Sequence, residues 1–304
     1  MISTYKYKST TWIDVESPTA DEIKSLIQKY AIHPLVAEEL LRPTIRSKVD
    51  VHKNFIYMIL HFPIFEHQLK MSMSCEIDFV IGKNFVITVH YRQIIPLYEI
   101  AKTLETNAIL KDGNFTKNGG VLVFYIVRQL YDFAARQLDH IQLKINKIED
   151  NIFKGREKEM VEGISYIRCD IIDFQRTIHA HKSVLYSLEP ASVNLFGKEF
   201  VHYLNNMVGE FVKIKNHLAV IKETIVSLQD TNDSLLTDKA NDTMKTLSIM
   251  AFLTFPLMLV AALFSMDTQF TPIIGVKGDF WIIVAMMLIG VLGMVVIFKR
   301  KKWL

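Results

Sequence analysis

Two uncharged apolar stretches decide the fold of this chain: LSIMAFLTFPLMLVAALF at 247–264 and FWIIVAMMLIGVLGMVVIF at 280–298. A helix of about 20 apolar residues is long enough to cross the hydrocarbon core of a bilayer. The alternative is a pair of buried helices in a soluble core, but such helices usually keep a polar stripe, and neither stretch has one. We therefore predict two transmembrane helices joined by a short extracytoplasmic loop over 265–279.

Basic residues near these stretches predict the orientation. Lys299, Arg300, Lys301 and Lys302 follow the second stretch, whereas the loop between the two contains only Lys277. The positive-inside rule places the basic tail at 299–304 in the cytoplasm, and two spans return the N-terminal part to the same side. Residues 1–16 are polar and mixed, which does not fit a signal peptide. We expect a multi-pass protein of the inner cell membrane with both termini in the cytoplasm.

The composition of the whole chain excludes several classes. It has 304 residues, 50% of them hydrophobic and 22% charged, with a net charge of +3. This composition excludes a disordered chain, and the small charge does not support binding to nucleic acid. Residues 1–115 are predicted to form a cytosolic α/β domain. Its β-rich runs lie at 55–60, 77–81 and 85–89, with a hairpin turn at 82–84 and a helix start at Ser17–Pro18.

The region over 116–246 is predicted to be helical, with long helices at 121–153 and 157–189 and a break at Glu189–Pro190. A third helix starts near Lys198 and has a seam of apolar residues at steps of three and four, which is typical of a packed or supercoiled helix. The seam consists of Val201, Leu204, Val208, Phe211, Ile214, Leu218, Ile221, Ile225 and Leu228. Neither proline nor glycine occurs between Gly209 and Pro256, so we expect this helix to continue as a stalk into the first span.

The number of spans bears on oligomeric state. Two packed helices enclose no lumen, so a single copy can anchor a domain but cannot conduct. Several copies packed around an axis can form a pore, and we expect the long seam to hold them together.

Several short sequence motifs occur near the N-terminus, at the start and middle of the first span and at the end of the chain. NDTMKTLSI (241–249) resembles the N-x-x-M-K-x-L-T-I entry to the first span of the CorA family of divalent-cation (magnesium/cobalt) transporters. FPL (255–257) and FKRKKWL (298–304) are similar to that family's mid-span and terminal elements. HPL (33–35), EEL (38–40) and RSKV (46–49) fit its cytosolic domain.

This resemblance implies a function as well as a fold. It implies a homo-oligomeric, pentameric funnel in membrane lipid that moves divalent cations, with Mg²⁺ first among them. Transport would be driven by the membrane potential and gated from the cytosolic domain. No resident cofactor is expected, and no catalytic constellation supports an enzyme.

One departure from the family motif bears on the ion. The family's Gly-Met-Asn at the outer end of the first span is Ser265, Met266 and Asp267 here. In the family, the asparagine amides form a ring that receives a hydrated cation, which suits Mg²⁺ because this ion sheds water reluctantly. A ring of Asp267 carboxylates would attract cations more strongly and slow their exit. Transport of Co²⁺, Zn²⁺ or Ni²⁺, with or without proton coupling, therefore stays open beside Mg²⁺.

The resemblance and the helical spacing together predict the pore-lining residues. Family equivalents of Asp230, Asn241, Met244 and Leu247 line the cytoplasmic part of the pore, and helical steps place further residues on that face. The predicted set is Asp230, Asn241, Met244, Leu247, Ala251, Phe255 and Met258. Asp230 and Asp267 are the predicted metal contacts.

Each of these assignments has an alternative. The apolar residues could pack between helices, Asp230 could lie on a solvated helix face, and Asp267 could be a hydrated loop acid. The chain could also be a membrane-anchored scaffold or sensor that does not conduct. Family members close when cytosolic divalent ions bind acidic residues between subunits, and Asp50, Asp78 and Asp173 are acidic candidates for that sensor.

Overall fold

The computed structural model describes residues 1–7, 9–66, 71–110, 118–266, 273–275 and 277–301. Contacts divide the chain into two compact units, Met1–Gln229 (unit 1) and Asp230–Leu304 (unit 2). Unit 1 holds a sheet and most of the helices, and unit 2 holds the two apolar stretches.

Unit 1 is built on a six-stranded sheet with the order β1-β2-β6-β5-β4-β3. The strands are β1 (Ile2–Tyr7), β2 (Thr10–Glu16), β3 (Lys48–Val51), β4 (Phe55–Glu66), β5 (Met71–Gly82) and β6 (Phe85–His90). Only the β2–β6 pair is parallel among the paired strands. The predicted hairpin at 82–84 is confirmed, because Ile81 pairs with Val86 across it.

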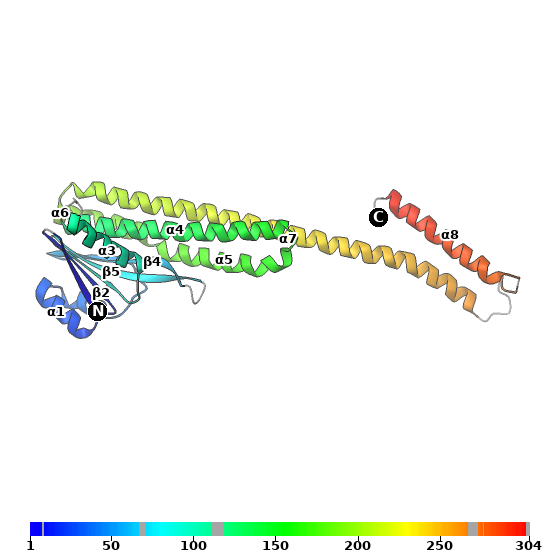
Figure 1. Ribbon diagram of the computed structural model, residues 1–304, viewed down its shortest axis with the longest axis horizontal. Coiled ribbons are helices and arrows are strands. Elements are labelled where there is room, and N and C mark those ends of the chain that lie inside the picture. The colour runs from blue at the N-terminus through cyan, green and yellow to red at the C-terminus, as the bar shows by residue number, and fades with distance from the viewer. Residues whose placement is uncertain (8, 67–70, 111–117, 267–272, 276, 302–304) are drawn as a thin grey trace. The chain divides into compact units, whose positions relative to one another are not determined.

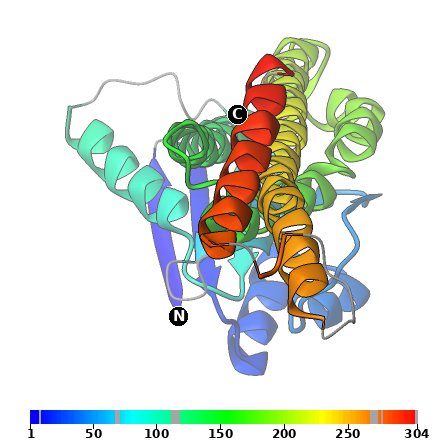
Figure 2. The same cartoon turned by 90° about the vertical axis from the view of Figure 1, so that its right-hand side faces the viewer.

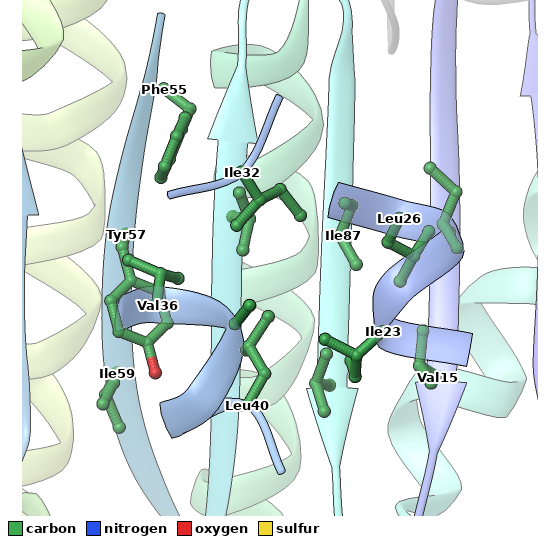
Figure 3. Packing of buried hydrophobic residues seen from close by; sticks show 14 residues of the cluster. Val15, Ile23, Leu26, Ile32, Val36, Leu40, Phe55, Tyr57, Ile59 and Ile87 are labelled. Carbon is green, nitrogen blue, oxygen red and sulfur yellow. The ribbon is translucent and has the colours of Figure 1, made fainter. Parts of the chain in front are cut away.

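Two short helices cover one face of this sheet: α1 (Ala20–Tyr30) and α2 (Pro34–Glu39). Their apolar residues pack against alternate residues of the central strands, as Figure 3 shows for Ile23, Leu40 and Ile87. The start of α1 differs from the prediction. Thr19, not Ser17, caps the helix, because its hydroxyl accepts the Glu22 N–H while the Glu22 carboxylate accepts the Thr19 N–H.

Longer helices cover the opposite face: α4 (Gly119–Phe153), α5 (Glu157–Ile178) and α6 (His181–Phe196). α3 (Ile95–Leu110) contacts α4 and β1. The green helices lie together on this side of the strands, away from the blue α1 (Figures 1 and 2). Successive side chains of a strand point to opposite faces of the sheet, and here both faces are apolar. On β4, Ile56 and Met58 are buried on this side, and Tyr57 and Ile59 on the other.

The prediction of one helix over 157–189 is wrong. The chain breaks at His179–Ala180, and Pro190 lies inside α6. The break accompanies a buried histidine: the His181 ring is fully buried, with Nδ1 2.8 Å from the Tyr131 hydroxyl and Nε2 2.7 Å from the His61 carbonyl. These tertiary contacts outweigh the local helical pattern.

The predicted seam lies on α7 (Phe200–Ser265) and is used within unit 1. Seven of its residues are buried: Leu204, Phe211, Ile214, Leu218, Ile221, Ile225 and Leu228. Side-chain contacts tie α7 to its neighbours, with Lys222 Nζ 3.2 Å from Gln175 Oε1 of α5 and the Tyr203 ring 5.1 Å from Phe124 of α4. The expectation that this seam holds copies together is therefore wrong, because the chain itself covers it.

Unit 2 consists of the remainder of α7 and of α8 (Asp279–Arg300). Both helices are long and apolar enough to cross a membrane. Yet only 6% of the most apolar 18-residue segment of α7, and 0% of that of α8, is buried. The core helix of a soluble protein would be mostly buried. Exposed apolar surface of this extent marks contact with a membrane or with other proteins.

Candidate functional site

The predicted pore residues of unit 2 occupy one side of α7. At about 100° per residue, Asp230, Asn241 and the five apolar candidates fall within an arc of roughly 120°. Asp230 and Asn241 are exposed, and the largest apolar members are 62–66% exposed: Met244, Leu247, Phe255 and Met258. Ala251 is half-buried. The chain's own packing therefore leaves this side of the helix largely uncovered.

The opposite side of α7 is the less exposed one. Its residues recur at steps of four, four, three and four: Ile249, Leu253, Leu257, Val260 and Phe264. Within the described part of unit 2 the other helix is α8, whose Phe298 is buried and lies 6.5 Å from the Phe252 ring. The described part of unit 2 therefore gives α7 a less exposed face and, opposite to it, the more exposed candidate face.

Polar groups on α7 are compatible with an apolar surrounding. The Thr254 hydroxyl lies 3.3 Å from the Ala251 carbonyl and that of Ser265 lies 3.0 Å from the Ala262 carbonyl, so both donate to their own helix. A group without such a partner would cost several kcal/mol in lipid. Within the span, therefore, the Thr254 hydroxyl does not prevent membrane insertion.

The structure describes two of the three residues predicted to form the pore entrance. Ser265 ends α7 and Met266 is 57% exposed, whereas Asp267 lies outside the described residues. Asp230 and Ser265 are separated by roughly 50 Å of helix at 1.5 Å per residue, so they cannot contact one ion together. No group of three or more His, Cys, Asp or Glu side chains able to hold a metal occurs among the described residues. A cation on this helix would need oxygen ligands from further copies or from water.

The three acidic sensor candidates do not form one site. Asp50 pairs with Lys48 at 2.6 Å, and Asp173 pairs with Arg176 at 3.4 Å. Asp78 is buried and accepts a hydrogen bond from the Tyr91 hydroxyl at 3.1 Å. Each candidate thus has its own partner in unit 1.

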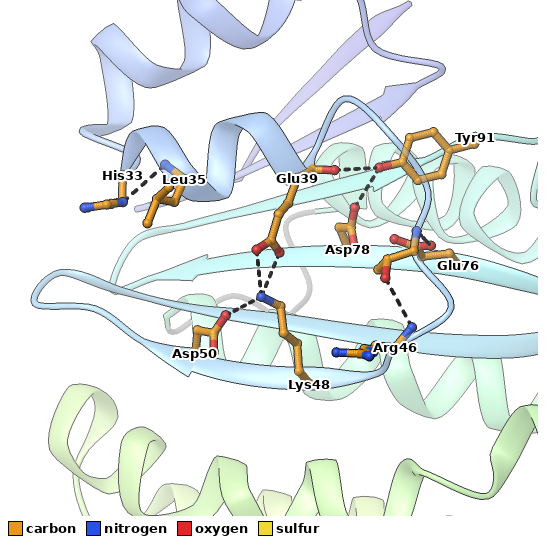
Figure 4. A network of polar contacts seen from close by, with 10 residues as sticks. His33, Leu35, Glu39, Arg46, Lys48, Asp50, Glu76, Asp78 and Tyr91 are labelled. Atoms are coloured by element: carbon orange, nitrogen blue, oxygen red, sulfur yellow. Dashed lines mark hydrogen bonds and ion pairs between the residues drawn. The ribbon is translucent and has the colours of Figure 1, made fainter.

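A polar cavity in unit 1 was missed by the sequence analysis. Glu76 and Asp78 lie two residues apart on β5 and are both buried (Figure 4). His61 of the neighbouring strand β4 pairs with Glu76. A cavity of about 480 Å³ opens next to Glu76. The signal in the sequence is the alternation Glu76-Ile77-Asp78-Phe79, which places two acids on one face of the strand.

Together, these features define a membrane protein: an α/β and helical unit followed by two exposed apolar helices. Comparison with known proteins makes the assignment specific. The family model described as "CorA-like Mg2+ transporter protein" matches residues 7–300, and the chain belongs to this family.

Individual relatives agree in length and fold. The chain is 25% identical to the cobalt/magnesium transport protein CorA of Thermotoga maritima, over 97% of this chain and 83% of that protein. It is 22% identical to its counterpart in Methanocaldococcus jannaschii, over 96% and 91% of the two chains. The complete structure of the CorA magnesium transporter from Methanocaldococcus jannaschii matches with a TM-score of 0.86, covering 99% of this chain and 93% of that one, at 22% identity. The predicted fold class is confirmed.

Proposed function

We propose that this chain is the subunit of a homo-oligomeric, pentameric channel or transporter of divalent cations in the cell membrane. Membership of the CorA-like Mg²⁺ transporter family supports the activity. The structural observation that carries the proposal is the division of α7 into a less exposed face and an exposed face with Asp230, Asn241 and Met244. Several copies that turn this uncovered face toward a shared axis would surround a pore.

The residues along that face would act in succession. Asp230 and Asn241 would form a polar vestibule on the cytoplasmic side, where carboxylate and amide oxygens attract hydrated cations. Met244, Leu247, Ala251, Phe255 and Met258 would form an apolar neck above it. An apolar constriction can close a pore by excluding water, so we assign the gate to this neck.

Surfaces outside the membrane would hold the copies together. The seam of α7 is buried within the chain, but Val212, Val220 and Val226 of the same helix are 42–60% exposed. Because these valines recur on one side of the helix, they are the apolar positions that a neighbouring copy would cover.

The expected orientation follows from charge. Lys299, Arg300, Lys301 and Lys302 would anchor α8 at the cytoplasmic side, which places both termini in the cytoplasm. The membrane potential would be the driving force, worth about 2.3 kcal/mol per charge per 100 mV. Unit 1 would lie on the cytosolic side and control the gate.

The transported ion depends on Asp267. With Ser265 and Met266, this residue would stand at the outer entrance of the pore. A ring of carboxylates binds cations more tightly than a ring of amides, and tighter binding changes which ions can also leave the site. Zn²⁺, Co²⁺ or Ni²⁺ is therefore the second candidate cargo, with protons as a coupled ion.

The test is ion-resolved flux into liposomes that contain the purified full-length protein. We expect Mg²⁺ entry that depends on an inside-negative potential and falls at least tenfold in Asp230→Ala. Asp242→Ala is the matched control, because this exposed acid lies on α7 at least about 100° away from the candidate arc. Asp267→Asn should raise the ratio of Mg²⁺ to Zn²⁺ flux if the carboxylate ring sets the preference.

Two results would overturn the proposal. Absence of flux for all four ions in the parent protein would favour a non-conducting anchor or sensor. Flux that is equally reduced in Asp230→Ala and Asp242→Ala would show that general acidity, and not the candidate face, matters.

A further inference from the structure

A groove in unit 1 lies between α5, the start of α6 and residues 211–222 of α7. Its volume is about 320 Å³, which lies within the usual range of small-molecule sites. The groove is distinct from the polar cavity beside Glu76, because the two have no lining residue in common. It also contains none of the proposed pore residues.

Apolar side chains form the floor of this groove. Ile178 of α5 lies there with Phe211 and Leu218 of α7, and all three are otherwise buried in unit 1. Ala219 adds a small, exposed side chain beside them. An apolar group that enters the groove would leave water and cover these carbon atoms, which is favourable.

Three exposed lysines line the same groove: Lys182 of α6, and Lys215 and Lys222 of α7. The Lys222 ammonium donates to the neutral Gln175 amide oxygen at 3.2 Å, and the Lys182 ammonium lies 5.9 Å from the centre of the Tyr186 ring. Neither contact brings a negative charge. Among the described residues, none of the three lysines forms an ion pair with an acid.

The sequence around the lysines explains why their charges remain unpaired. A side chain on a helix reaches residues three and four positions away. For all three lysines these positions hold apolar or aromatic residues and His179, with no Asp or Glu. Glu223 follows Lys222 directly, but it points about 100° further round the helix and does not line the groove.

The groove therefore has a positive charge without a counter-charge. None of the described residues that line it is acidic. Like charges that share a groove attract an anion, and lysine ammonium groups bind carboxylates and phosphates as flexible point charges. Charge complementarity thus selects an anion, and the apolar floor selects a ligand with an apolar part.

We propose that this groove binds a small organic anion with an apolar body. The body, an aromatic ring or a short acyl chain, would lie on Ile178, Phe211 and Leu218. Its carboxylate or phosphate group would pair with the lysines at the edge. Such a ligand uses both properties of the groove, whereas an inorganic anion or a neutral apolar molecule uses only one.

The test is thermal unfolding of the full-length protein in detergent with millimolar probes. The probes are 4-phenylbutyrate and 1-naphthyl phosphate, which distinguish a carboxylate from a phosphate. The control 4-phenylbutyramide has the same body without the charge, and acetate and inorganic phosphate have the charge without the body. We expect at least one probe to raise the unfolding temperature by about 2 to 4 °C and the controls to leave it unchanged.

Charge variants make the outcome specific. The triple variant Lys182→Gln/Lys215→Gln/Lys222→Gln changes only exposed side chains and should weaken binding by about tenfold or more. The matched control removes three other exposed lysines, so its net charge is the same, and it should bind like the parent. This control is Lys24→Gln/Lys158→Gln/Lys213→Gln.

A steric variant tests the groove without a change in charge. Ala219→Trp places a large ring beside the apolar floor while all three lysines remain. Because Ala219 is exposed, the added ring should leave the fold intact. It should occupy the groove and weaken binding by about tenfold or more.

Three results would overturn the proposal: no probe stabilises the parent protein, the neutral or inorganic controls stabilise it equally, or the triple variant keeps the full response. A neighbouring copy that filled the groove would give the first of these results. None of them depends on whether the protein conducts ions, so this site and the proposed pore fail or succeed separately.

Discussion

Unit 1 and unit 2 are both rich in apolar residues but place them differently. In unit 1 the chain covers its own apolar side chains, and Phe79 and Phe174 are completely buried. In unit 2 the apolar side chains of α8 remain open, with Ile289 70% and Leu292 63% exposed. The difference lies in the pattern, because apolar residues alternate with polar ones in unit 1 and surround the helices in unit 2. Unit 1 thus covers its own apolar core, whereas the described apolar side chains of unit 2 remain largely uncovered by the chain itself.

Truncation of a core side chain should have the largest effect. Phe79→Ala in unit 1 removes a buried ring and should lower the free energy of unfolding by about 3 to 5 kcal/mol. Phe280→Ala in unit 2 removes a ring that is 64% exposed, and in detergent it should change this free energy by less than about 0.5 kcal/mol. Denaturant unfolding followed by near-UV circular dichroism measures both. Equal losses would show that the two units are built alike.

A charge in the apolar helix should have the next largest effect, and only in unit 2. Ile289→Arg places a guanidinium near the middle of α8, which should disfavour membrane insertion by about 3 to 4 kcal/mol. Leu143→Arg on α4 is the control, since that leucine is 56% exposed in unit 1 and should tolerate the charge. Partition between membrane and soluble fractions is the measurement. Normal insertion of Ile289→Arg would contradict the assignment of α8 as a span.

Acid should affect unit 1 and not unit 2. Burial lowers the pKa of His181 from 6.5 to about 4, so the unfolded chain binds a proton there before the folded chain does. The resulting stability is fully present above pH 6.5 and declines as the pH falls toward 4, by roughly 3 kcal/mol in total. Unit 2 contains no histidine. Amide hydrogen exchange, corrected for intrinsic rates, should therefore accelerate with acid around β4 and α6 but not in α8. The substitution His181→Asn should remove much of this pH dependence.

Loss of a helix cap should have the smallest effect. Thr19→Ala removes the hydroxyl that accepts the Glu22 N–H and should destabilise unit 1 by about 1 kcal/mol. Ser17→Ala is the control, because the sequence suggested Ser17 as the cap but the structure gives that role to Thr19. A larger loss from Ser17→Ala would contradict the observed capping box. Thermal unfolding resolves a difference of this size.

The contrast between the two units also explains which parts of the fold could be predicted from the sequence. The two spans were predictable because uncharged runs of this length have few alternatives, and the β5–β6 hairpin was predictable from its local turn. Strands β1 and β3 were not, since they are short strands at the edges of the sheet, and β2 was not, since it becomes an inner strand only through pairing with the distant β6. The break at His179–Ala180 was not predictable for the same reason, because it accompanies contacts of His181 with residues 50 and 120 positions away.

The candidate functional residues also form two groups, one that could be predicted from the sequence and one that could not. A helical repeat is local, so the shared face of Asn241, Met244 and Phe255 could be derived from spacing and is consistent with their exposure. Glu76 and Arg176 could not be connected, because a hundred residues separate them and only the packed unit brings them to one cavity.

The order of the strands has a consequence for how the protein is made. The parallel pair of β2 with β6 closes the sheet only once residues up to His90 are available. About 150 further residues separate His90 from Leu247, which corresponds to roughly 10 to 30 s of synthesis. The sheet therefore has time to form before the first apolar stretch leaves the ribosome. Translation in this order keeps the most apolar segments inside the ribosome until the sheet of unit 1 has had time to form.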